Sequence, residues 1–157
     1  MLTNPDFREL LRIFKKNKVR YLIVGGYAVM KYSEPRFTKD LDMFIATDRQ
    51  NAERVHSALR QFGAPLENLT PEDFTHKGHF YQMGRPPFRV DIMMSISGVD
   101  FEEAWMNREI VKLDDLEILF MSRSDLILAK NASGRPQDKI DIEQLRKAEQ
   151  MDQPDKD

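Results

Sequence analysis

Residues 20–45 read RYLIVGGYAVMKYSEPRFTKDLDMFI, and this stretch decides which fold we expect. The continuous apolar run at residues 21–24 predicts a buried strand. The run stops at Gly25-Gly26, and the apolar segment that follows is typical of a short helix. Residues 40–45, DLDMFI, then predict a second strand. This order of strand, glycine turn, helix and strand indicates an α/β (α+β) domain.

The rest of the chain predicts more helices and strands around the same sheet. An amphipathic helix at the start carries the buried stripe Phe7, Leu10, Leu11 and Phe14. Further helices are expected at residues 48–62, 99–106 and 125–132 (capped by Ser124) and from Pro136 onward, and further strands at residues 79–83, 88–94, 109–113 and 116–120. We expect one domain over residues 1–150, with a mixed β-sheet and flanking helices, followed by a polar tail at 151–157.

The composition narrows the possible function classes. The net charge of −2 argues against gripping nucleic acid through bulk charge. The absence of cysteine excludes disulfides and thiolate zinc sites and suits a reducing cytoplasm. No apolar run approaches the roughly 20 residues that span a bilayer, so no membrane partner is expected. One basic stripe offers either a modest surface for RNA phosphates or a solvated helix face: Arg8, Arg12, Lys15, Lys16, Lys18 and Arg20.

Three aspartates are the candidate catalytic residues. Asp40 and Asp42 are two positions apart on a predicted strand, so their side chains leave the same face of the sheet. Asp91 lies between Val90 and Ile92 on a later strand and points away from their buried face. If the two strands are neighbours, the three carboxylates converge, and their repulsion favours binding of a cation such as Mg²⁺. The alternatives are a solvated strand edge or a salt-bridged surface residue.

Gly25-Gly26 is a candidate phosphate-binding turn. Glycine permits a tight turn and lets a phosphate approach the N–H groups at the start of a helix. The 14 positions from Gly26 to Asp40 leave room for one short helix that returns the chain to the sheet. The turn can then lie beside the carboxylates. The alternative is a plain strand-to-helix turn.

These motifs resemble those of the DNA polymerase β-like nucleotidyltransferases. The resemblance rests on Gly25-Gly26 after a strand, on the Asp-x-Asp of residues 40–42 and on the third Asp at position 91. Residues 36–42 and 130–145 are more narrowly similar to the AbiEii-type toxins of bacterial toxin–antitoxin systems. One departure is Gly26, where many members carry serine and its hydroxyl.

The resemblance implies the nucleotidyltransferase fold and a role for each motif. Asp40 and Asp42 would hold Mg²⁺ bound to a nucleoside triphosphate such as ATP, and Asp91 would complete a site for a second ion at the acceptor hydroxyl. The implied nucleotide-binding residues are Gly25, Gly26, Arg36, Thr38 and Lys130. Lys130 could instead be a surface lysine, and Thr38 a local turn hydroxyl.

The implied reaction transfers a nucleoside monophosphate to a hydroxyl acceptor. That acceptor could be an RNA or tRNA end, a protein side chain or a small molecule, and a toxin would have an antitoxin as partner. The competing interpretations are a noncatalytic module that binds a nucleotide or a partner protein, and an α/β domain with coincidental aspartates. Asp138 and Asp141 are predicted to form salt bridges rather than to bind metal. A loop with His76, Lys77 and His79 could meet an acceptor.

Overall fold

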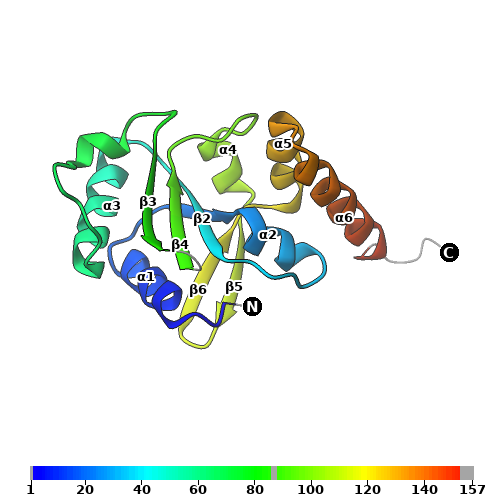
Figure 1. The fold of residues 1–157 in the computed structure, drawn as a ribbon, viewed down its shortest axis with the longest axis horizontal. Coiled ribbons are helices and arrows are strands. Elements are labelled where there is room, and N and C mark those ends of the chain that lie inside the picture. Colours follow the sequence, from blue (N-terminus) through cyan, green and yellow to red (C-terminus); the bar gives the residue numbers. More distant parts are fainter. Residues whose placement is uncertain (1, 86–87, 153–157) are drawn as a thin grey trace.

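A six-stranded mixed sheet forms the centre of the molecule (Figure 1). The computed structural model describes residues 2–85 and 88–152. The strands are β1 (Tyr21–Val24), β2 (Asp40–Ile45), β3 (Phe80–Arg85), β4 (Phe88–Met93), β5 (Glu109–Leu113) and β6 (Leu116–Phe120), in the spatial order β3-β4-β2-β1-β6-β5. The β2–β4 and β1–β6 pairs are parallel, and the other neighbours are antiparallel. The predicted α/β class with a mixed sheet is therefore confirmed.

Helices lie on both sides of this sheet. They are α1 (Pro5–Lys16), α2 (Gly25–Tyr32), α3 (Arg49–Phe62), α4 (Phe101–Met106), α5 (Arg123–Ser133) and α6 (Pro136–Asp152), with a short 3₁₀ helix at Pro71–Phe74. Figure 1 shows α1 and α3 together on one side and α2, α4, α5 and α6 together on the other. Within the described ranges, no helix is both long enough and apolar enough to cross a membrane.

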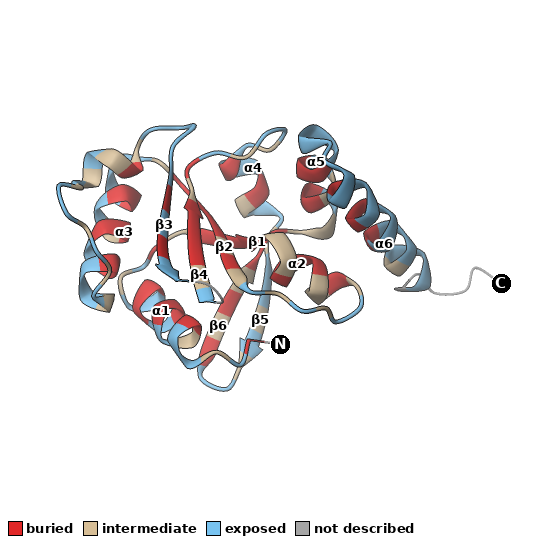
Figure 2. Ribbon diagram, in the orientation of Figure 1, coloured by how far each residue is buried: buried red, intermediate tan, exposed pale blue. Residues whose placement is uncertain are grey.

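The core lies mainly between the sheet and the pair α1 and α3. The predicted stripe of α1 is buried, and Phe14 packs edge-on against Tyr21 with ring centroids 5.8 Å apart. Leu41 and Met43 of β2 are fully buried, while Asp40 and Asp42, which alternate with them, stay partly exposed. Burying each large apolar side chain contributes about 1.5–3 kcal/mol. Figure 2 shows this buried layer running through the central strands. One face of β2 is thus core, and the other face is partly exposed at Asp40 and Asp42.

Several predicted boundaries are wrong, and capping explains two of them. Helix α5 begins at Arg123 because Ser122, not Ser124, accepts the N–H of Asp125 at 3.2 Å. Helix α4 begins two residues later than predicted because Asp100 caps it. Strand β3 continues to Arg85, and the expected turn falls partly on residues 86–87, which lie outside the described residues. Helix α6 extends to Asp152, into the predicted tail, and residues 153–157 are not described.

Candidate active site

The sheet register brings the three candidate aspartates together. Strands β2 and β4 are parallel neighbours, with Asp42 directly opposite Asp91 and Asp40 opposite Arg89. Paired residues on adjacent strands face the same side of a sheet. Asp40, Asp42 and Asp91 therefore share one face, as the alternation of the two strands predicted. This is the face on which α2 begins.

The carboxylates crowd one another. Burial, followed by the negative charge of Asp91, raises the pKa of Asp42 from 3.8 to about 7. A hydrogen bond with Asp91 and the charge of Asp40 add to this rise, and Arg89 opposes it. The Asp91 side chain is itself only 13% exposed. The site can hold all three groups ionised at neutral pH only if more positive charge is supplied.

Arg89 supplies part of that charge, and our reading of the sequence missed it. Its Nη2 donates to Asp40 Oδ2 at 3.1 Å and to Asp91 Oδ2 at 3.4 Å, and its Nε lies 3.2 Å from Asp91 Oδ1. Its position two residues before Asp91 was a usable signal, because this spacing puts both side chains on one face of β4. As the side chains lie, no three acidic or histidine residues in the described ranges surround a metal position.

The donor set nevertheless suits a hard divalent cation. All three candidate ligands are carboxylates, which are the oxygen donors that Mg²⁺ prefers. Asp91 Oδ1 is buried and has no hydrogen-bond partner among the described residues, since Arg89 Nε approaches it without hydrogen-bonding alignment. An acceptor atom left unpaired in a negative cluster is suited to bind a cation. Asp40, Asp42 and Asp91 could hold Mg²⁺ once Arg89 has moved.

The glycine turn is shaped by close approach to the carboxylates. Gly25 has φ +67°, and a Cβ atom there would lie 2.9 Å from Asp42 Cγ. Gly26 is not at positive φ, but a Cβ atom there would lie 2.7 Å from Thr38 Cγ2 and 3.3 Å from Arg36 Nη2. Helix α2 begins at Gly25 itself, two residues earlier than predicted. Its first N–H groups therefore lie next to Asp42 and the loop before β2.

Thr38 and Arg36 border this helix start. The Thr38 hydroxyl is buried and has no hydrogen-bond partner in the described part of the chain. Arg36 Nη1 donates to Asp141 Oδ1 of α6 at 2.6 Å. Both predicted nucleotide-binding residues thus lie beside Gly26, one with a free hydroxyl and the other held by an acid.

Lys130 belongs to a buried ionic network on α5 and α6. Its Nζ lies 2.9 Å from Asp141 Oδ2 and 3.5 Å from Asp138 Oδ1, and both acids are 1% exposed. Although burial by itself raises the pKa of Asp138, hydrogen bonds from Arg135 and Ser133 lower that pKa to about 2. The predicted salt bridges of both acids are confirmed. The network connects Lys130, through Asp141, to Arg36 on the loop before β2.

One hollow adjoins the aspartates, and a second lies beside Arg36 and Thr38. A cavity of about 230 Å³ lies between the sheet and the C-terminal helices, lined by Gly25, Asp42, Met93, Ile96, Leu126 and Lys130 among others. A groove of about 600 Å³ lies where β2 and β4 begin, lined by Tyr27, Met30, Arg36, Phe37, Thr38 and Phe88 among others. Phe37 and Phe88 are 82% and 57% exposed, so aromatic surface is available there. Asp42 thus faces the first hollow, whereas none of the three aspartates lines the second.

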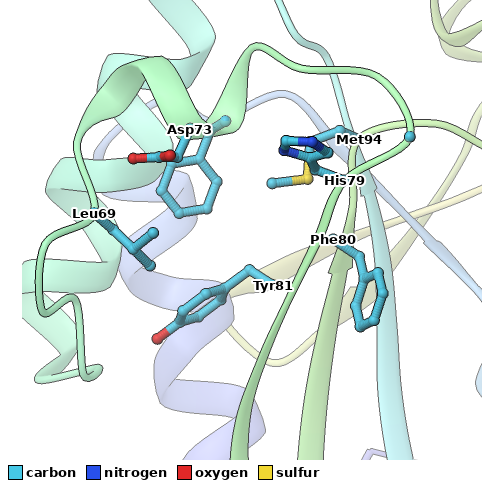
Figure 3. Close-up of a pocket in the computed structure, with 8 residues that line it drawn as sticks. Leu69, Asp73, His79, Phe80, Tyr81 and Met94 are labelled. Carbon is cyan, nitrogen blue, oxygen red and sulfur yellow. The ribbon is translucent and has the colours of Figure 1, made fainter.

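Two other groups of residues that the sequence offered as binding surfaces, the loop with His76 and His79 and the basic stripe, are not part of this site. His79 lines a separate cavity of about 300 Å³ with Asp73, Phe80 and Tyr81, and none of the three aspartates lines it (Figure 3). His76 lies in that loop and contacts His79 and Glu72. In the basic stripe, ion pairs join Arg8 to Asp114, Arg12 to Asp115 and Arg20 to Glu102. This pairing favours a solvated helix face over an RNA-binding surface.

Two solved structures have a fold similar to that of this chain. The crystal structure of the lincosamide antibiotic adenylyltransferase LnuA, lincomycin-bound, is similar with a TM-score of 0.60 and 18% identity, over 93% of this chain and 98% of that chain. A Thermotoga maritima protein described as a nucleotidyltransferase gives 0.54 and 15%, over 92% and 87%. At this identity the likeness shows the fold alone. No curated protein matches the chain.

A family model settles the broad assignment. The model is described as "Nucleotidyltransferase of unknown function (DUF6036)", and it matches residues 6–155, nearly the whole chain. The predicted relation to nucleotidyltransferases is confirmed at this level, and the narrower relation to AbiEii-type toxins stays a prediction. The chain belongs to the DUF6036 family of nucleotidyltransferases.

Proposed function

We propose that this protein transfers a nucleoside monophosphate from a nucleoside triphosphate to a hydroxyl acceptor, in a reaction that depends on Mg²⁺. The observation that carries the proposal is the convergence of Asp40, Asp42 and Asp91 beside the N-terminus of α2. Carboxylates next to exposed helix N–H groups combine a cation site with a phosphate site. A noncatalytic module would not need all three acids.

In the proposed reaction, the acceptor oxygen attacks the α-phosphorus of the nucleotide. The new acceptor–phosphorus bond forms as the bond to pyrophosphate breaks, and pyrophosphate leaves with its electron pair. Bound Mg²⁺, held by Asp40, Asp42 and Asp91, would neutralise charge at the attacking and leaving oxygens. Asp91 would also accept the proton of the acceptor hydroxyl, and its position opposite Asp42 on the same face of the sheet supports this role.

The remaining residues would position the nucleotide. The N–H groups of Gly26 and the following residues of α2 would donate to phosphate oxygens, and the Thr38 hydroxyl would add a donor. Lys130 lines the cavity next to Asp42, and the apolar lining residues Met93, Ile96 and Leu126 would suit a nucleoside. Catalysis would then consist of positioning and charge neutralisation.

The finer parts of the proposal rest on the sequence resemblance. ATP is the proposed donor, and an RNA or tRNA end or a protein side chain is the proposed acceptor. We further propose that the protein is a cytoplasmic toxin and that its partner is an antitoxin. The groove beside Arg36 and Phe88 supports an acceptor with a flat or apolar part, because exposed aromatic rings offer stacking surfaces. Its size also admits a small molecule.

The test is transfer of label from the α-phosphate. The protein is incubated with each α-³²P nucleoside triphosphate, magnesium and total cell extract, and the RNA, protein and small-molecule fractions are counted. We expect label in one fraction, lost with EDTA and with Asp42→Asn. Asp115→Asn, on the exposed β5–β6 turn, is the matched control that keeps activity. Absence of label from every fraction, with nucleotide binding intact, would favour the noncatalytic alternative.

A further inference from the structure

A guanidinium group lies between two of the proposed metal ligands. Arg89 contacts Asp40 at 3.1 Å, and it contacts both carboxylate oxygens of Asp91 at 3.2 and 3.4 Å. These are the oxygens that a cation bound by the three aspartates would use. The position between Asp40 and Asp91 therefore already has a resident positive charge.

The backbone position of Arg89 directs its side chain toward the carboxylates. It is two residues before Asp91 on β4 and directly opposite Asp40 on β2, so its side chain leaves the sheet on the face of the carboxylates. The side chain is 35% exposed, so part of it is open to solvent. A guanidinium has five N–H donors in a planar fork, so it can bridge two carboxylates at once.

We infer that Arg89 is a built-in counter-cation, which holds Asp40 and Asp91 in the metal-free protein and has to release them when a divalent cation binds. This inference rests on the proposed metal site, and it concerns a residue that no proposed catalytic step uses. Two cations cannot share the same carboxylate oxygens without repelling each other. Arg89 is thus a positioning residue that lowers the affinity of the site for metal.

The test measures metal binding alone, without nucleotide. Binding of MnCl₂ is titrated by calorimetry, and free Mn²⁺ is followed by electron paramagnetic resonance, for the parent and for Arg89→Met. We expect Arg89→Met to bind Mn²⁺ roughly tenfold or more tightly, since one neighbouring charge shifts the proton affinity of a carboxylate by about 1–3 log units. The matched control is Arg85→Met, which removes the same charge from the exposed end of β3. It should change the affinity less than about twofold because solvent screens that charge.

Thermal unfolding supplies a second readout. In EDTA, Arg89→Met should melt below the parent because the carboxylates lose their counter-cation, and saturating Mn²⁺ should raise its Tm by more than it raises that of the parent. If Arg89→Met does not fold, Arg89→Lys keeps the charge without the bridging fork, and we expect it to bind Mn²⁺ more tightly than the parent. Equal or weaker Mn²⁺ binding by the folded variant overturns the inference and leaves the proposed function standing. Absence of Mn²⁺ binding by both parent and variant overturns the metal centre itself.

Discussion

Gly25 leaves no room for a side chain, because Asp42 occupies the space where its Cβ atom would be. The Cβ position lies 2.9 Å from Asp42 Cγ and closer still to one of its carboxylate oxygens. The residue also has φ +67°, a conformation that favours glycine. One residue thus links the helix start that would bind phosphate to the carboxylate that would bind metal.

Gly25→Ala should therefore disturb both parts of the site. We expect it to lower the free energy of unfolding by about 1–3 kcal/mol through the strained φ, and in addition to displace Asp42 and weaken binding of nucleotide. Gly63→Ala is the matched control, since Gly63 has φ +91° but open space around its Cβ position. Denaturant unfolding compares the two variants. Equal losses of stability, with nucleotide affinity unchanged, would contradict the contact with Asp42.

Gly26→Val tests the phosphate site separately from the metal site. The side chain would meet Thr38 and Arg36, whereas the proposed metal ligands lie on β2 and β4. We expect Mn²⁺ binding to survive and affinity for a nonhydrolysable triphosphate to fall at least about tenfold, because a branched side chain blocks the approach to the helix N–H groups. On samples shown to be folded, calorimetry measures Mn²⁺ binding without other divalent ions and triphosphate affinity at saturating magnesium. Unchanged triphosphate affinity would reduce Gly25-Gly26 to a structural turn.

The stability of the metal-free protein should depend on the ionisation of Asp42. Its folded-state pKa of about 7 lies above the ordinary 3.8, so between these pH values the folded protein keeps a proton that the unfolded chain has lost. This contribution to stability is complete below pH 3.8 and is lost as pH rises to about 7. In EDTA, Asp42→Asn should thus exceed the parent in stability by more than about 1 kcal/mol near pH 8.

The same pair of proteins provides the control. Below pH 3.8 the two stabilities should nearly coincide, because the carboxyl at position 42 is then neutral in both the folded and the unfolded parent. Magnesium near pH 8 should raise the Tm of the parent and not that of Asp42→Asn. If Asp42→Asn melts well below the parent near pH 8 in EDTA, Asp42 is a structural residue.

Local sequence patterns predict where the candidate aspartates lie, but they do not predict which arginines pair with the acids. The reason is physical. The alternation of side chains along a strand is a property of the backbone itself, so residues 40–42 and 90–92 suffice to place each aspartate on the face opposite the core. That Arg89 meets Asp40 depends on β4 lying beside β2, a neighbour choice made by packing of the whole sheet. The bond from Arg36 to Asp141 joins residues 105 positions apart. No short stretch of sequence contains both partners of either contact.

Capping errors have a similar origin. Ser122 and Ser124 are equally good N-cap residues, and the end of β6 at Phe120 decides between them by fixing where the chain leaves the sheet. Helix α2 begins two residues earlier than predicted, although glycine has a low helix propensity. Contact with Asp42 and Thr38 makes small residues necessary there. Tertiary contact thus overrides helix propensity at the position closest to the proposed chemistry.

Asp141 should be the acid whose loss most weakens the fold around the site. Its 1%-exposed carboxylate contacts Arg36 at 2.6 Å, Lys130 at 2.9 Å and Gln137 at 2.9 Å. Asp141→Asn would leave two cations without their shared partner, and removing one member of a buried ion pair costs about 3–5 kcal/mol. The exposed pair of Arg8 with Asp114 offers the contrast, because Asp114→Asn should cost less than about 1 kcal/mol.

A double-mutant cycle can separate the network from simple loss of a carboxylate. If Asp141 acts by holding Arg36, then Arg36→Gln in the Asp141→Asn background should restore part of the lost stability, because it removes one of the cations left unpaired. The cycle is measured by urea unfolding of the parent, the two single variants and the double variant. Additive losses would mean that the 2.6 Å contact between α6 and the loop before β2 carries no coupling energy. Helix α6 would then cover the site without holding the loop that carries Arg36 and Thr38 in place.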